Sequence, residues 1–148
     1  ALAGAALNIA VLKSDLELAV RTEKEIRAVK PDARVNIVLN TEIDASKRYD
    51  LLVNACPVGM YPRVNACPVS DEVIERADCV FDLIYNPRET LLVQKAKAMG
   101  KRAAGGMAML VWQAVSAHEI WDSDKYTDDE VKAIIKEMEA AVEKNFKI

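Results

Sequence analysis

The chain of 148 residues is poor in the residues that mark several classes of protein. It has one histidine, three cysteines, five glycines and five prolines, and aromatic residues make up only 5% of it. One histidine and three cysteines, none of them in a Cys-X-X-Cys pair, make a metal site unexpected and predict three free thiols in a reducing compartment. No apolar run approaches the roughly 20 residues that a membrane-spanning helix needs, so we expect no membrane partner.

The chain also lacks an excess of charge of either sign. Its 20 Lys and Arg residues against 23 Asp and Glu residues leave a formal net charge of −3, and the basic residues form no cluster. Nucleic acid is therefore not an expected partner. Hydrophobic residues make up 51%, which excludes a disordered chain and suffices for a packed core. The amino-terminal stretch has no basic region of a signal peptide, and we predict a cytoplasmic protein.

A glycine-rich phosphate loop is absent as well. No Gly-X-Gly-X-X-Gly motif occurs, and Gly4 stands alone in a stretch that resembles the end of a helix entering the first strand. A dinucleotide-binding domain opens with a strand and a glycine-rich turn before that helix. We therefore expect the chain to contain only part of such a domain, as a fragment or because its true start lies elsewhere.

Short apolar runs alternate with helical patterns along the whole chain. The runs at 7–12, 33–39, 49–55 and 79–85, with a short fifth one near 101–104, are typical of parallel strands covered on both faces. This alternation predicts an α/β fold over residues 1–148, as one partial domain. We expect a doubly wound, mostly parallel, Rossmann-like sheet that lacks its first strand and its glycine-rich loop and is followed by a carboxy-terminal helix.

Capping signals predict where the helices begin. Capping boxes start at Ser14 and Thr127, and Ser70 and Thr90 precede two shorter helices. In the first and last helices, the apolar periodicity predicts core-facing side chains. These are Leu16, Ala19, Ile26 and Val29 in the first helix and Val131, Ile134, Ile135, Met138 and Val142 in the last.

The carboxyl ends of three strands carry polar or flexible residues, and in open α/β sheets ligands bind at such ends. Asn54 and Cys56 follow the third strand, Tyr85 follows the fourth, and the Gly105-Gly106 pair follows the fifth. Together they predict a ligand-binding rim. Two alternatives stay open: the glycine pair as a plain strand-to-helix turn, and Tyr85 as an aromatic residue packed against a helix.

The helix that follows the glycine pair carries further polar candidates. Met109 and Gln113 share one face, while Val111, Ala114 and Val115 are expected to point into the core. Gln113 needs a hydrogen-bond partner, which is a ligand or a nearby backbone group. We expect Asp82 to bond a neighbouring loop backbone and His118 to be a surface residue.

Three segments resemble one known family. NACPVGMYP (54–62), VFDLIYNPRETLLVQKAKAMG (80–100) and GGMAMLVWQAVSAHEIW (105–121) are similar, in order and spacing, to the carboxy-terminal half of shikimate dehydrogenases. The resemblance covers roughly residues 49–121. It implies a Rossmann-like cofactor domain that acts with an amino-terminal substrate domain. Such enzymes reduce 3-dehydroshikimate to shikimate with NADPH, in the shikimate pathway of aromatic amino-acid biosynthesis.

The resemblance also implies roles for individual residues. The substrate would be hydrogen-bonded by Tyr85 and Gln113, and the nicotinamide end of the cofactor would be contacted by Asn54, Cys56, Leu83, Gly106 and Met109. The family carries its catalytic Lys and Asp on the amino-terminal domain. We therefore expect no catalytic residue within the chain and no dehydrogenase activity from the chain alone.

Some positions depart from the family pattern. Cys56 stands where the family has Thr, and Ala108 where it has Gly. Lys13-Ser14 follows the first strand, where the family places an Asn-Arg pair that holds the 2′-phosphate of NADP, so NAD is an alternative to NADP. The chain is also compatible with a quinate/shikimate dehydrogenase and with a non-catalytic α/β binding module. An uncovered sheet edge adds the hypothesis of a homo-oligomer.

Overall fold

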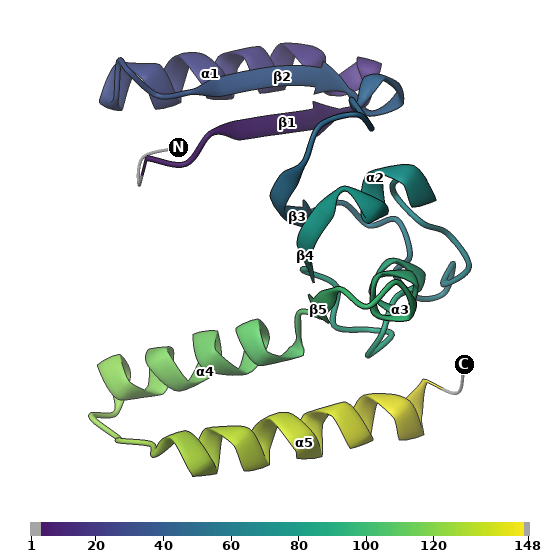
Figure 1. The fold of residues 1–148 in the computed structure, drawn as a ribbon. Helices are drawn as coiled ribbons and strands as arrows, with labels where there is room; N and C mark the ends of the chain where they lie inside the picture. The colour runs from purple at the N-terminus through teal and green to yellow at the C-terminus, as the bar shows by residue number, and fades with distance from the viewer. Residues whose placement is uncertain (1–3, 147–148) are drawn as a thin grey trace. The chain divides into compact units, whose positions relative to one another are not determined.

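The structure is a computed structural model that describes residues 4–146. The chain divides into two compact units, Ala1–Ala45 and Ser46–Ile148 (Figure 1). Every strand predicted from the sequence is present, although the fourth begins two residues earlier and ends three residues earlier than expected. Gly4 and Ala5 are not helical, and the rest of the predicted helix end, at residues 1–3, lies outside the described residues.

The first unit consists of two parallel strands and the helix that connects them. β1 (Leu7–Val11) pairs with β2 (Val35–Leu39) in register from one end to the other. Parallel neighbours need a crossover connection, which here is a short 3₁₀ helix (Lys13–Asp15) followed by α1 (Leu16–Val29). Figure 1 shows α1 running alongside the two strands.

The predictions for α1 are correct in part. The helix ends before Pro31 and buries Ala19, as expected, but Leu16 and Val29 are 39% and 75% exposed. The expected apolar stripe is therefore wrong at both of its ends, because the helix of 14 residues is longer than the strands of five residues beneath it. Ile26 is half-buried.

The predicted capping box at Ser14 is also wrong. The N-cap of α1 is Asp15, with no side-chain cap bond, because the 3₁₀ helix takes up Ser14. The hydroxyl of Ser14 donates to Oδ1 of Asp15 instead, at 3.1 Å.

The second unit is built on a parallel three-stranded sheet. The strands β3 (Tyr49–Asn54), β4 (Ala77–Asp82) and β5 (Arg102–Ala104) lie in the order β3-β4-β5. The helix α2 (Asp71–Glu75) leads into β4, and α3 (Leu91–Ala98) connects β4 to β5. Because all three strands are parallel, their carboxyl ends lie at one border of the sheet.

The expected α/β class with parallel strands is confirmed, but the described strands form two sheets and not one continuous sheet. Within residues 4–146, β1 pairs only with β2, and β3 pairs only with β4. Each of these two strands therefore has a second edge without a strand neighbour among the described residues.

Two apolar clusters stabilise the second unit. One lies between the sheet and the helices α2 and α3, and its buried members are Ile74, Ala77, Val80, Leu92 and Ala96. The other joins the helices α4 (Met107–Trp121) and α5 (Asp128–Asn145) through Met107, Val111, Val115 and Val131.

The predicted core faces of these two helices are nearly correct. Val111 and Val115 are buried, and Val131 is fully buried. Ile134, Ile135 and Val142 are half-buried against the same cluster. The prediction is wrong for Ala114, which is exposed, and for Met138, which is 42% exposed, because a pair of helices covers only a narrow seam.

The remaining caps agree with the sequence. The hydroxyl of Thr90 accepts a hydrogen bond from the Val93 N–H at the start of α3, and Thr127 forms a complete capping box with Glu130 at the start of α5. Ser70 is the N-cap of α2 without a side-chain cap bond. Among residues 4–146, no helix is both long enough and apolar enough for a membrane span.

Candidate functional site

The carboxyl end of β4 holds a buried polar centre. Asp82 is fully buried (0% exposed), and its Oδ1 accepts hydrogen bonds from the side-chain amide of Asn54 and from the Ile84 N–H, both at 3.0 Å. Its Oδ2 accepts from the hydroxyl of Thr90 at 2.6 Å. The expected bond to a loop backbone is thus confirmed. The sequence did not predict the two side-chain partners, because Asn54 lies on another strand.

Asn54 is held entirely by the protein itself. It is 4% exposed, and its amide nitrogen donates to Asp82 and to the carbonyl of Val58 (3.3 Å). Its Oδ1 accepts from the Cys56 N–H at 3.1 Å and from the Cys56 thiol at 3.0 Å. The side chain of Asn54 therefore shapes the loop after β3, and this loop presents the exposed thiol of Cys56.

The Gly105-Gly106 turn packs directly against the end of β4. The Gly106 N–H donates to the carbonyl of Ile84 at 2.8 Å. A Cβ atom on Gly106 would overlap the carbonyl oxygen of Leu83, and one on Gly105 would lie 2.8 Å from the carbonyl oxygen of Arg88. The predicted tight turn is therefore confirmed, and both glycines are required by the approach of the protein's own backbone.

Tyr85 directly follows this packed segment. It is 46% exposed, so its phenol is accessible from solvent. In the next residue, Asn86, the carbonyl accepts from the Tyr61 N–H at 3.0 Å, whereas the buried Oδ1 has no hydrogen-bond partner among residues 4–146. Most buried polar atoms in proteins have a partner, so this oxygen is an exception, and no local pattern of residues indicated it.

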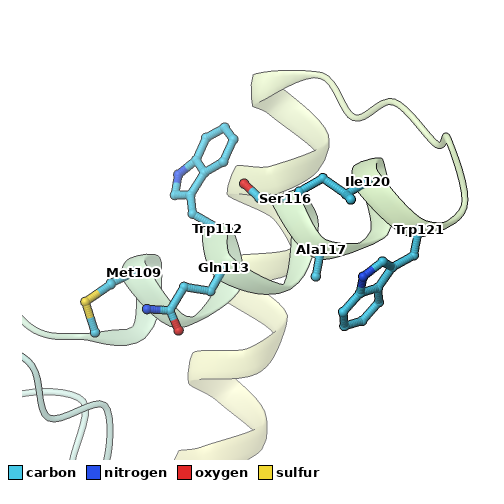
Figure 2. Close-up of a pocket in the computed structure, with 7 residues that line it drawn as sticks. All are labelled: Met109, Trp112, Gln113, Ser116, Ala117, Ile120 and Trp121. Atoms are coloured by element: carbon cyan, nitrogen blue, oxygen red, sulfur yellow. The ribbon is translucent and has the colours of Figure 1, made fainter.

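The exposed face of α4 is hollowed next to the predicted substrate-binding residue Gln113. Figure 2 shows Met109 and Gln113 one turn apart on this helix. The hollow is lined by Met109, Trp112, Gln113, Ser116, Ala117, Ile120 and Trp121. Gln113 is exposed, and its side chain makes no hydrogen bond to the described residues. The alternative of a backbone partner is therefore wrong, and the amide is accessible to a ligand.

His118 is a surface residue, as expected. Its side chain is 54% exposed, and its Nδ1 lies 2.8 Å from Oδ2 of Asp122. With Asp124, these two residues bring three potential ligand atoms within 4.8 Å of one another, and all three residues are exposed. The sequence did not predict this group, because a loop brings Asp124 back to the end of α4.

In the second unit, Cys56 and Cys67 differ in environment. Burial raises the pKa of the Cys67 thiol above its ordinary value and outweighs the backbone hydrogen bond at Val69 and the charge of Lys95, which lower it. Cys67 therefore stays protonated at neutral pH and is unsuited to act as a nucleophile. Cys56 is exposed and lies in the loop held by Asn54.

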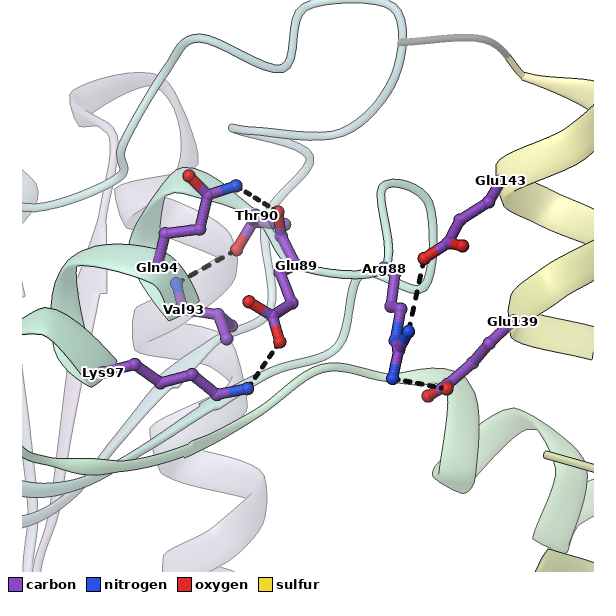
Figure 3. A network of polar contacts seen from close by, with 8 residues as sticks. All are labelled: Arg88, Glu89, Thr90, Val93, Gln94, Lys97, Glu139 and Glu143. Carbon is purple, nitrogen blue, oxygen red and sulfur yellow. Dashed lines mark hydrogen bonds and ion pairs between the residues drawn. The ribbon is translucent and has the colours of Figure 1, made fainter. Parts of the chain in front are cut away.

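The segment between β4 and α3 is anchored to two helices (Figure 3). Arg88 forms ion pairs with Glu139 at 3.1 Å and with Glu143 at 3.3 Å, which lie one turn apart on α5. Glu89 pairs with Lys97 of α3 at 2.5 Å. The segment that follows Tyr85 is therefore tied to both α3 and α5.

This arrangement defines a class of protein. Three parallel strands end at one border, where a buried Asp–Asn pair, an exposed phenol and a glycine turn meet. Binding at the carboxyl ends of parallel strands is the general arrangement of Rossmann-like nucleotide-binding domains.

The relatives of the chain are more specific. No family model matches it. It is 42% identical over 90 residues to the shikimate dehydrogenase (NADP(+)) of Clostridium beijerinckii, a match covering 61% of this chain and 33% of that protein. It is 34% identical over 123 residues to the enzyme of that name from Methanococcus maripaludis, covering 80% of this chain and 42% of that protein. The chain thus spans less than half the length of these relatives.

Solved structures point to the same enzymes. A shikimate dehydrogenase in complex with NADP+ matches with a TM-score of 0.74 and 30% identity, over 88% of this chain and 46% of that chain. Shikimate dehydrogenase 1 from Peptoclostridium difficile matches with a TM-score of 0.67 and 29% identity, over 94% and 56%. The resemblance in the three segments is confirmed: the homologues of this chain are NADP+-dependent shikimate dehydrogenases, which are oxidoreductases, and its fold is Rossmann-like.

Proposed function

We propose that this chain is the cofactor-binding portion of a shikimate dehydrogenase that reduces 3-dehydroshikimate to shikimate with NADPH. One observation carries the proposal: the ends of β3, β4 and β5 are joined by hydrogen bonds into one rim. The carbonyl of Asn54 accepts from the Leu83 N–H at 3.0 Å, and the carbonyl of Ile84 accepts from the Gly106 N–H at 2.8 Å. The three segments that resemble the family therefore meet at one place.

In this proposal Tyr85 and Gln113 hydrogen-bond the substrate. Both side chains are exposed, and each offers a group that donates and accepts hydrogen bonds. The described hydrogen bonds leave the amide of Gln113 without a competing partner. The task of Tyr85 and Gln113 is to orient the ring ketone of the substrate, since correct orientation removes much of the barrier to a bimolecular reaction.

We infer that the nicotinamide end of NADPH lies at the rim. NADPH supplies the hydride, and Leu83, Gly106 and Met109 would form the wall beside its ring, with the loop of Asn54 and Cys56 beside its ribose. The half-buried Met109 gives this wall an apolar part that excludes water. Asn54 acts here by holding the loop, because all its hydrogen bonds are made within the protein.

The proposal includes inactivity of the chain alone. No position matches the catalytic Lys and Asp of the family, and the sequence holds no Gly-X-Gly-X-X-Gly motif for the diphosphate. Purified chain mixed with 3-dehydroshikimate and NADPH is expected to give no decrease in NADPH absorbance. A measurable rate would refute this part of the proposal.

Binding is tested by NMR titration of the labelled 148-residue chain with NADP+, and separately with shikimate. NADP+ is expected to shift the amide signals of Cys56, Leu83 and Gly106, and shikimate those of Tyr85 and Gln113. A Gln113→Ala variant should weaken the response to shikimate, whereas Gln94→Ala, a change of an exposed Gln on α3, should leave it unchanged. Shifts confined to other parts of the chain would refute the site. The same titration with NAD+ decides the cofactor preference.

We further propose that the protein acts in the cytoplasm and associates with itself. Three free cysteines favour a reducing compartment. The unpaired edge of β3 carries Leu51 and Val53, which are 55% and 46% exposed and suit pairing with another chain. Light scattering of the purified chain should show a mass above that of a monomer, and a monomer would contradict self-association.

A further inference from the structure

We propose that Asp82 is the positioning residue of the rim: its buried carboxylate sets the conformation of the loop after β3 and of the segment after β4. This inference rests on the proposed function, because the two segments it orders are those assigned to the cofactor and the substrate. Asp82 itself touches neither ligand, since it is fully buried.

The bonds of Asp82 explain why a carboxylate is needed. Its three partners are all donors: the Asn54 amide and the Ile84 N–H at Oδ1, and the Thr90 hydroxyl at Oδ2. An ionised Asp offers only hydrogen-bond acceptors, because both of its terminal atoms are oxygens without a proton. An Asn in its place would turn one of the two oxygens into a donor and would face a donor with a donor.

Asp82 and the carbonyl of Val58 together decide which way the amide of Asn54 points, because the Nδ2 of Asn54 donates to both. Since the Nδ2 of Asn54 must donate to Asp82, its Oδ1 is directed to the N–H and the thiol of Cys56. The opposite orientation would place two oxygens against each other and would leave the Cys56 N–H without this acceptor. The position of the exposed thiol on the rim is therefore set from the buried carboxylate.

The same carboxylate holds the segment that leads to Tyr85. The Ile84 N–H donates to Asp82, and the Ile84 carbonyl accepts from the Gly106 N–H. The residue that precedes Tyr85 is thus tied on both sides. The carbonyl of Leu83 is held so close to Gly106 that no side chain fits there.

Helix α3 does not need Asp82 to begin. The hydroxyl of Thr90 accepts from the Val93 N–H, and this cap bond uses the oxygen as an acceptor while its proton is directed to Asp82. A buried carboxylate is costly to desolvate, and a helix cap alone does not require it. What the carboxylate adds is the coupling of the two rim segments.

The test compares the full 148-residue chain with Asp82→Asn and with the control Val131→Ala. The control removes buried methyl groups between α4 and α5 and touches none of the rim bonds. Hydrogen exchange of backbone amides is followed by NMR. In Asp82→Asn the exchange of the Cys56 and Gly106 amides should accelerate at least about tenfold beyond that of the Val93 amide. In Val131→Ala these amides should change no more than the Val93 amide.

If Asp82→Asn does not fold, a second pair of variants tests the positioning role of Asp82. Thr90→Val removes one of the three donors, whereas Thr90→Ser keeps the hydroxyl. Exchange at Cys56 should accelerate about threefold or more in Thr90→Val and return to the wild-type rate in Thr90→Ser. Unchanged exchange in Thr90→Val, or equal acceleration in both variants, would overturn the positioning role.

NADP+ titration separates this inference from the proposed function. The dissociation constant should rise about tenfold in Asp82→Asn and less than about twofold in Val131→Ala. Equal affinity of the wild type and Asp82→Asn would overturn the positioning role while leaving the proposed function intact. If the wild type does not bind NADP+ at all, the proposed function is refuted, and the exchange rates alone then support or overturn the ordering of the two segments by Asp82.

Discussion

The two units of the chain have the same strand–helix pattern but very different interiors. In Ala1–Ala45, the buried apolar residues are Ala19, Ala33 and Val35, within the part that the structure describes. The unit from Ser46 to Ile148 has two clusters of buried residues and contains both Trp, all four Tyr and both Phe of the chain. The candidate site lies entirely in this better-packed unit.

Polar contacts take the place of a core in the first unit. Arg27 of α1 donates to the carbonyls of Ala33 and Val35, both at 3.0 Å, and so ties the helix to β2. Its ion pair with Glu23 joins side chains that are 43% and 26% exposed, and ion pairs open to solvent contribute little to stability. An alternation of strands and helices therefore predicts the class of fold but does not say which part of it is firmly packed.

The largest difference in stability loss between the two units is expected when a glycine is replaced. Gly106→Ala should cost about 3 kcal/mol of unfolding free energy or more, because its Cβ would overlap the carbonyl oxygen of Leu83. Gly4→Ala, in the first unit, should cost only about 1 kcal/mol, since it meets no atom within 4 Å and is strained only by its φ of +90°. Urea denaturation followed by circular dichroism measures both. Equal losses would contradict the comparison.

A matched pair of leucines should separate the two interiors. Leu92→Ala should lower the unfolding free energy by about 2–5 kcal/mol, because the side chain is 1% exposed and leaves a cavity. Leu18→Ala, on α1, should change it by less than about 0.5 kcal/mol, because that side chain is 65% exposed.

Two spectroscopic probes can follow the unfolding of these leucine variants, and they report on different parts of the chain. Fluorescence of Trp112 and Trp121 reports only on the second unit, whereas circular dichroism reports on both units. Leu92→Ala should therefore shift the fluorescence transition. Leu18→Ala should leave the transitions followed by both probes unchanged, and a loss in its circular dichroism transition as large as that of Leu92→Ala would contradict the comparison.

The helix caps are expected to give a smaller contrast. Thr127→Ala should cost about 1 kcal/mol, because it removes the side-chain half of the capping box of α5. Ser14→Ala should be nearly neutral, since this hydroxyl makes no cap bond to α1. A measurable loss in thermal unfolding of Ser14→Ala would indicate that the capping box predicted from the sequence does form in solution.

The smallest effect is a pH dependence from the same capping box. Hydrogen bonds from the backbone and the hydroxyl of Thr127 lower the pKa of Glu130. A carboxyl with a lowered folded-state pKa stabilises the fold above its ordinary value of about 4.3, and this contribution is lost as the pH falls through the lowered value. The urea midpoint of the wild type should therefore exceed that of Glu130→Gln at about pH 6, and this difference should shrink as the pH falls to about 3. The change should correspond to the uptake of about one proton on unfolding. A constant difference would contradict the role of this carboxylate.

The fold was predictable from most of the local signals, although the capping box expected at Ser14 does not form. Thr90, Thr127 and the strand runs act within a few residues, so their outcomes agree with the sequence. The predictions failed where exposure depends on how far the neighbouring elements extend over a helix, as at Val29 and Met138. For the site, the strand ends indicated Asn54, Tyr85 and Gly106, but the bonds that join them run between positions up to 29 residues apart, as between the Leu83 N–H and the Asn54 carbonyl.

The sequence alone determined the periodicity of each element, the start of most helices and the three segments that resemble shikimate dehydrogenases, because these depend on the order of neighbouring residues. Only the tertiary structure decided that the amide of Asn54 is used inside the protein, that Gln113 is open, and that Asp82 joins the ends of neighbouring strands. The physical reason is that a buried hydrogen bond depends on which segments approach one another, and parallel pairing brings together residues that are far apart in the chain.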